Sequence, residues 1–262
     1  MSAPVCLLTG GTSGIGRCTA DCMRKAGYTV YELSRRESGE ENHFSADVTD
    51  ETAVRAAVAE ILAKEDGVDV VINCAGYGIS GAVEFTEHSD AKRQLDVNFY
   101  GMVNVNRAVL PSMRERGRGR IVNVSSVAGA IPIPFQTYYS CSKAAINAYT
   151  MALANEVRPY GVTVCAVQPG DIRTGFTDAR KKNPAGDEAY GGRIAKSVAG
   201  MEHDERNGMM PEAAGSFICR VAQKSSHKPI YTIGAQYRIF CAIAKLLPLR
   251  LLNYFVGKLY AA

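Results

Sequence analysis

Three side chains in the middle of the chain have the chemistry of a proton-transfer site. Tyr139 and Lys143 stand four residues apart at the start of an Ala-rich stretch, and residues four apart share one face of a helix. A neighbouring ammonium group favours the phenolate, so Lys143 is expected to lower the pKa of Tyr139 toward a value useful in acid/base catalysis. Ser126 follows the apolar strand predicted at 121–124, and its hydroxyl would bind the oxygen that exchanges a proton with Tyr139.

A Tyr and a Lys at this spacing also occur on solvated helix faces, so the hypothesis needs a cofactor site. The glycine-rich segment 9–16 lies between a short apolar run at 5–8 and a helical stretch at 17–26. Glycines there permit a tight turn and bring the backbone close to a pyrophosphate at the positive helix N-terminus. The residues expected to contact the dinucleotide are Gly10, Thr12, Ser13, Gly14, Ile15 and Gly16.

The residues after the second predicted strand, 28–33, indicate which dinucleotide binds. An acid often follows this strand in NAD-specific folds and binds the ribose 2′-hydroxyl. Here Arg35 and Arg36 follow instead, and guanidinium groups favour a 2′-phosphate. The sequence therefore predicts NADP(H). The alternative is a solvated arginine pair in a turn, and strand alternation is expected to point Glu32 elsewhere.

Further cofactor contacts are expected where other predicted strands end. Short strands at 42–46, 68–72 and 161–167 alternate with helical segments, which predicts one doubly wound Rossmann domain with a mainly parallel sheet. Ligands of such sheets bind at the carboxyl ends of the strands. The expected contacts there are Asp47, Val48, Asn73, Ala75, Gly76, Pro169, Gly170, Ile172 and Thr174.

Composition excludes several other kinds of function. The chain has 262 residues, of which 47% are hydrophobic and 21% charged, as expected of a globular domain with a large core. Its net charge of +4 is dispersed, so no nucleic-acid partner is predicted. Eight cysteines without a Cys-x-x-Cys pair suit the cytoplasm, and four scattered histidines support neither a metal site nor a histidine-based triad. No stretch of 18 apolar residues is present to span a membrane.

Taken together, these motifs resemble the short-chain dehydrogenase/reductase family, from about residue 5 to residue 233. The resemblance implies that Tyr139 is the general acid/base and that Ser126 positions the carbonyl or hydroxyl. It also implies that Lys143 holds the nicotinamide ribose and that Asn98 anchors a water-linked proton relay. The alternative for Asn98 is a polar side chain that bonds backbone within a long helix. A homodimer or homotetramer through the helices around Asn98 and Tyr149 is implied as well.

Three segments bear on the substrate. Residues 127–135 are almost wholly apolar and flank the predicted reacting centre, which favours a lipophilic substrate; the alternative is that they only pack beneath the active-site loop. Residues 174–210 have the composition of a mobile lid whose charges face water. Residues 235–262 form an amphipathic extension to the catalytic domain at 1–234, interrupted at Pro248. This extension is expected to cover the cleft or a subunit interface, with peripheral contact with a membrane surface as the alternative.

The predicted function is an NADP(H)-dependent oxidoreductase that interconverts a secondary alcohol and a ketone on a steroid-like or lipid-like substrate. The tail is similar to the family branch of retinol dehydrogenases, 17β-hydroxysteroid dehydrogenases and acyl-dihydroxyacetone-phosphate reductases. The alternatives are an acyl-dihydroxyacetone-phosphate, retinoid, sugar or polyol substrate. Two non-enzymatic alternatives also remain: a regulator that senses NADPH, and a protein whose tail binds a lipid surface as its main function. Cytoplasmic localisation is expected, with membrane contact possible only through the tail.

Overall fold

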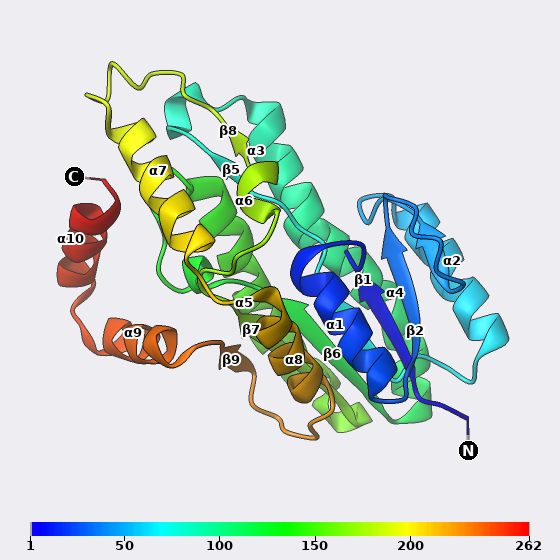
Figure 1. Cartoon of the computed structure of the whole chain (residues 1–262). Helices are drawn as coiled ribbons and strands as arrows, with labels where there is room; N and C mark the ends of the chain where they lie inside the picture. Colours follow the sequence, from blue (N-terminus) through cyan, green and yellow to red (C-terminus); the bar gives the residue numbers. More distant parts are fainter. Residues whose placement is uncertain (1, 262) are drawn as a thin grey trace.

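A seven-stranded parallel sheet forms the centre of the protein in the computed structural model, which describes residues 2–261 (Figure 1). Its strand order is β3-β2-β1-β4-β6-β7-β9, and every pairing is parallel. The strands are β1 (Val5–Thr9), β2 (Thr29–Ser34), β3 (His43–Ser45), β4 (Val70–Asn73), β6 (Gly119–Val124), β7 (Val162–Gln168) and β9 (Ile230–Thr232). The doubly wound fold predicted from the sequence is confirmed.

Helices cover both faces of the sheet, which explains why its strands are apolar at successive positions. Leu7 of β1 points into one core cluster and Leu8 into the other. The helices of the first face are α2 (Glu51–Lys64), α4 (Gly101–Arg116) and α5 (Thr137–Val157). Those of the second are α1 (Gly14–Lys25) and α8 (Pro211–Ala222), which lie side by side in Figure 1. Gly215 permits this approach, because a Cβ there would lie 2.8 Å from Cys18.

Shorter elements surround the carboxyl ends of the strands. Helix α3 (His88–Leu95) joins α4 through a π-helical turn, η2 (Asp96–Tyr100). The strands β5 (Ile79–Ser80) and β8 (Lys181–Lys182) form a second, two-stranded sheet. The remaining helices are η1 (Val83–Phe85), η3 (Val127–Gly129), η4 (Arg158–Tyr160), α6 (Phe176–Ala179), α7 (Arg193–Arg206), α9 (Ala235–Leu246) and α10 (Leu249–Tyr260).

The strand order reverses between β1 and β4, and a cavity of about 1130 Å³ lies at the carboxyl ends of these strands. A topological switch point of this kind is where open α/β sheets bind their ligands. The cavity extends from the segment after β2 to that after β7, and it is large enough for a dinucleotide with a further small molecule. The fold therefore presents all the predicted cofactor segments at one edge.

The segment 174–210 forms part of the cavity wall, but its charges do not all face water as expected. The side chain of Arg180 is fully buried and forms an ion pair with Glu205 of α7. Glu205 also accepts a hydrogen bond of 2.7 Å from the Thr177 hydroxyl. The sequence prediction was wrong for these charges because each is neutralised by a partner about 25 residues away, which composition does not reveal.

The two tail helices, α9 and α10, lie along one side of the molecule (Figure 1). One face of each packs on the domain, where Cys241 and Val256 join Ile131 in a small core cluster. Packing on the protein, one of the two roles expected of the tail, is thus observed for this face. Within residues 2–261, no helix is both long and apolar enough to cross a bilayer.

Candidate active site

The glycine loop is built to bring backbone close to a ligand. Gly10 has a φ of +73°, and a Cβ there would lie 2.9 Å from the backbone of Ala75. A Cβ on Gly16 would lie 2.1 Å from the carbonyl oxygen of Gly10. No side chain caps the first turn of α1, and Ser13 at its N-cap lines the cavity. The first-turn N–H groups are thus suited to bind an anion.

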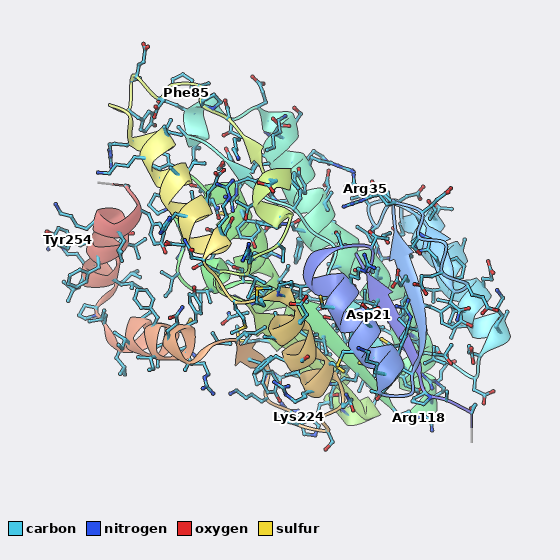
Figure 2. The ribbon with its side chains drawn as sticks, viewed as in Figure 1. Asp21, Arg35, Phe85, Arg118, Lys224 and Tyr254 are labelled. Carbon is cyan, nitrogen blue, oxygen red and sulfur yellow. The ribbon has the colours of Figure 1, made fainter. Side chains whose placement is uncertain are left out.

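The predicted loop residues Gly10, Thr12, Ser13, Gly14, Ile15 and Gly16 all line the cavity. So do Arg35 and Arg36, which leave β2 as exposed side chains (Figure 2 labels Arg35). Nη2 of Arg36 lies 3.4 Å from the Ser13 hydroxyl, and neither arginine forms a salt bridge with any described carboxylate. Two guanidinium groups without a described salt-bridge partner therefore line the cavity, and that of Arg36 lies beside the helix N-terminus.

Glu32 does not compete with these arginines for a ligand. Its carboxylate is buried beneath Gly11 and bonds Arg24 at 2.8 Å, so strand alternation does point it away from the cavity. The acid that could have bound a ribose 2′-hydroxyl is thus neutralised inside the protein.

Asp47 and Val48 line the far end of the cavity, as expected. Burial alone would raise the pKa of the Asp47 carboxyl, but hydrogen bonds from Thr49 and Arg93 outweigh it and hold the pKa below its ordinary value. Nη2 of Arg93 lies 2.7 Å from Oδ2 of Asp47. The carboxylate is therefore ionised and held in one orientation.

Asn73 is not in the cavity wall, unlike the neighbouring Ala75 and Gly76. Its side chain is buried and donates to Oδ1 of Asn106 at 2.8 Å and to Oδ1 of Asn123 at 2.9 Å. Asn123 in turn donates to Thr150 of α5. Asn73 thus ties β4 to β6, and the same network reaches α4 and α5, instead of lining the cavity as predicted.

Ser126 and Tyr139 both line the cavity, and their side chains are hydrogen-bonded to each other. Ser126 is the N-cap of η3, and its hydroxyl accepts a hydrogen bond of 3.1 Å from the amide of Ala128. Burial raises the pKa of Tyr139 to about 12, and hydrogen bonding to Ser126 opposes that rise. Tyr139 is therefore a protonated phenol throughout the neutral pH range.

Lys143 lies beside Tyr139 on α5, as the spacing predicts, with Nζ 5.6 Å from the centroid of the tyrosine ring. It donates to the carbonyl oxygen of Val124 at 2.9 Å rather than to the phenol. Burial lowers the pKa of Lys143 to about 8. The expectation that Lys143 depresses the pKa of Tyr139 is not supported, because burial dominates both groups and the amine is directed at the strand end.

Asn98 lies in the π-helical turn and does not line the cavity. Its side chain binds both backbone groups of Tyr77, with Oδ1 accepting from the amide and Nδ2 donating to the carbonyl, each at 3.0 Å. A Cβ on Gly76 would lie 3.2 Å from Oδ1 of Asn98 and 3.7 Å from Nζ of Lys143. The structure thus brings Asn98 near Lys143, and π-helical turns of this kind frequently occur at functional sites.

The segment after β7 closes the cavity on the side of Tyr139. Pro169, Gly170, Ile172 and Thr174 all line it, as expected. Thr174 accepts a hydrogen bond of 3.2 Å from the amide of Phe176, whose ring lies 5.7 Å from that of Tyr139. The predicted nicotinamide segment is therefore next to the predicted proton donor.

Several cavity residues were missed in the sequence analysis. Tyr237 of α9 and Tyr260 of α10 line the cavity together with Asp171 and Asp204. The Tyr237 hydroxyl donates to Oδ2 of Asp171, and its ring lies over Gly170, where a Cβ would collide at 2.2 Å. Residues 237, 241 and 244 share the buried face of α9, and this helical spacing is the signal that could have pointed to Tyr237, although it does not show what the face covers.

Carboxylates gather at this end of the cavity. Burial raises the pKa of Asp171, and Asp204 and Glu205 add to the rise, although the Tyr237 hydroxyl opposes it. Glu205 is paired with Arg180, whereas no described cation forms a salt bridge with Asp171 or Asp204. This end of the cavity thus has two carboxylates, Asp171 and Asp204, without a salt-bridge partner among the described residues.

The comparisons with known proteins agree with this geometry. The sequence model of the short chain dehydrogenase family matches residues 4–185. The chain is 38% identical to a 3-ketodihydrosphingosine reductase of Bacteroides thetaiotaomicron, covering 100% of this chain and 99% of that protein. It is 31% identical to the probable short-chain type dehydrogenase/reductase VdlC of Helicobacter pylori, covering 92% of each.

Solved structures show the same relationship. A short-chain dehydrogenase from Streptomyces avermitilis superposes with a TM-score of 0.82 at 30% identity, covering 98% of this chain and 96% of that one. A structure of ElxO with NADP bound superposes with a TM-score of 0.75 at 26% identity, covering 90% of this chain and 99% of that one. The chain therefore belongs to the short-chain dehydrogenase/reductase family of oxidoreductases.

Proposed function

We propose that this protein is an NADPH-dependent reductase of a lipid-like ketone, with Tyr139 as the proton donor. The observation that carries the proposal is the burial of Tyr139 beside Ser126, which keeps the phenol protonated with a pKa of about 12. A protonated phenol suits the reduction of a carbonyl, since that reaction consumes a proton at the oxygen. Alcohol oxidation would instead need the phenolate.

The choice of NADPH rests on Arg35 and Arg36. These two arginines lack carboxylate partners among residues 2–261, while Glu32 is bound by Arg24. The glycine loop and the uncapped first turn of α1 would hold the pyrophosphate, and Thr174 and Ile172 would contact the nicotinamide end. When bound, NADPH supplies the hydride for the carbonyl carbon.

The side chains of the protein would orient the ketone and deliver the proton. The hydroxyls of Ser126 and Tyr139 would both donate to the carbonyl oxygen, stabilising the negative charge that develops there. Tyr139 then transfers its proton. Lys143, held by the Val124 carbonyl, would support the negative charge left on the phenol, and Asn98 near its amine would extend the route for proton return.

The cavity favours a long-chain ketone that carries an amine. The substrate named for the Bacteroides relative, 3-ketodihydrosphingosine, has an alkyl chain and a protonated amine on the carbon beside its ketone. Apolar residues that would face the chain include Val127, Ile133 and Met201. Asp171 and Asp204 are placed to bind the ammonium group, because a charge-assisted hydrogen bond is stronger than a neutral one. We therefore propose an α-amino ketone of this class as the substrate.

The other predicted substrates fit this end of the cavity less well. A steroid or a retinoid offers no cation to Asp171 and Asp204, and the phosphate of an acyl-dihydroxyacetone phosphate would meet these carboxylates with like charge. A sugar would leave the apolar wall without a partner. The homo-oligomer expected through α4 and α5, and a cytoplasmic location, remain predictions.

Turnover of 3-ketodihydrosphingosine with NADPH is the first expected outcome, measured as loss of absorbance by the cofactor. A matched ketone without the amine should have a kcat/KM about tenfold or more lower. Replacing Asp171 with Asn should remove most of this difference between the two ketones. Tyr139→Phe should abolish turnover but retain NADPH binding, which also separates an enzyme from a sensor. Equal rates for both ketones in the wild-type protein would contradict the proposed role of the carboxylates.

Ketone reduction should become slower as pH rises through about 8. Burial lowers the pKa of Lys143 to about 8, so its charge is complete below that pH and is lost above it. The titration of Tyr139, near 12, lies outside the accessible range. With the matched ketone, which has no amine of its own to titrate, Lys143→Arg should abolish the descending limb, whatever its absolute rate, because a guanidinium stays protonated. A wild-type kcat/KM that stays constant through pH 8 and well above it would contradict this assignment.

The double change Arg35→Ala and Arg36→Ala should raise KM for NADPH by about tenfold to hundredfold, since each arginine would lose a charge-assisted contact. KM for NADH should stay within about twofold of its wild-type value. Arg17→Ala is the matched control, because Arg17 is an exposed arginine on α1 that does not line the cavity. A parallel change in KM for both cofactors would rule out recognition of a 2′-phosphate by these arginines.

A further inference from the structure

The tail carries a concentration of exposed apolar side chains that the rest of the molecule lacks. Nine of the fifteen exposed large hydrophobic side chains among residues 2–261 belong to α9 and α10. Leu246 is 84% exposed and Leu249 is 80% exposed. We call these nine residues the tail face: Ile239, Phe240, Ile243, Leu246, Leu249, Leu251, Tyr254, Phe255 and Leu259.

The tail helices are fixed in place by their opposite face, so the exposure does not come from an undocked segment. Cys241, Ala244, Leu252 and Val256 join the cluster around Ile131. The backbone carbonyl of Ala261 also accepts a hydrogen bond of 2.5 Å from Nε of Arg193. Figure 2 shows Tyr254 on the outer side of α10, away from the sheet. The helices thus present a second apolar side to the outside.

All charged side chains of the tail are basic. Arg238, Lys245, Arg250 and Lys258 are exposed, and residues 235–262 contain no Asp or Glu. None of these four basic side chains forms a salt bridge with a described carboxylate. The neighbouring helix α7 adds the exposed Arg193 and Lys196, while Asp171 and Asp204 lie on the cavity side of the tail. The tail face is therefore an apolar surface interleaved with unpaired positive charge.

We propose that the tail face binds an anionic lipid surface, with α9 and α10 lying in its plane. Interleaved apolar and basic side chains on short amphipathic helices are the pattern of interfacial binding. Each helix has 12 residues and is about 18 Å long, which is too short to cross the hydrocarbon layer. A second copy of the chain would fit the tail face less well, because two such faces in contact would bring like charges together.

This surface and the catalytic cavity share the same two helices. Tyr237 and Tyr260 face inward from α9 and α10 into the cavity, whereas the tail face lies on their outer side. A lipid-bound protein would therefore hold its cavity next to the lipid. Uptake of substrate from that surface rests on the proposed function, but the binding itself does not, so it is tested without turnover.

The test is co-sedimentation of the full-length protein with vesicles. The protein should bind vesicles that contain phosphatidylglycerol, and about tenfold or more weakly those of pure phosphatidylcholine. Leu246→Glu with Leu249→Glu should abolish binding, and Lys245→Glu with Arg250→Glu should weaken it by about tenfold or more. The matched control is Lys25→Glu with Arg114→Glu, the same change of charge at exposed sites on α1 and α4, which should bind as the wild type does.

Two further measurements separate loss of lipid binding from loss of folding and from self-association. Circular dichroism and NADPH binding establish that each variant is folded, independently of any ketone substrate. Gel filtration without vesicles shows whether the tail face instead joins two copies of the chain. Wild-type protein that fails to sediment with anionic vesicles would overturn the proposal. So would an oligomer that the Leu246 and Leu249 changes dissociate, or equal weakening by the control variant.

Discussion

Removal of water from Tyr139 and Lys143 is the constraint on which the site depends. Burial moves their two pKa values in opposite directions, so that the phenol keeps its proton and the amine holds its proton less tightly. Helix α5 provides this environment by packing against the end of β6, where Ser125 donates to the carbonyl of Lys143 at 3.0 Å. The lysine amine returns a hydrogen bond to Val124. Strand end and helix are thus joined at the point where chemistry would occur.

Burial of the Lys143 amine lowers the free energy of unfolding of the protein at neutral pH. The pKa of Lys143 is lower in the folded protein than its ordinary value of 10.5, so the folded state binds this proton less well than the unfolded chain does. The destabilisation is complete below pH 8 and is relieved as pH rises from about 8 to 10.5. A buried amine retained under such a penalty is expected of a functional group rather than of a core residue.

The sequence predicted those features that depend on local pattern or on contact across a short range of chain. Glycines between a strand and a helix identified the loop at Gly10 and Gly16, and alternation along β2 correctly removed Glu32 from the cavity. Motif spacing also placed Ser126, Tyr139 and Lys143 together. The first two inferences need only the geometry of one turn or one strand, whereas Ser126 was matched to Tyr139 through the spacing of the family motif.

Features that arise between distant segments were not predictable in the same way. Asn73 follows a strand end as a cofactor ligand would, but its orientation is set by Asn106 and Asn123, which no local pattern reveals. The pKa of Tyr139 depends on how deeply the packed domain buries it. Arg180 is neutralised by Glu205, and Tyr237 reaches Asp171 across 66 residues of chain. These contacts follow from tertiary packing.

In the proposed reaction, a hydride reaches the carbonyl carbon of a lipid-like ketone while the protein supplies the proton. The most direct measurement uses NADPH deuterated at both C4 positions, with 3-ketodihydrosphingosine in ordinary water and mass spectrometry of the product. This reaction should give an alcohol with one deuterium, located on the carbinol carbon. An alcohol formed without deuterium, or no alcohol from this ketone, would contradict it.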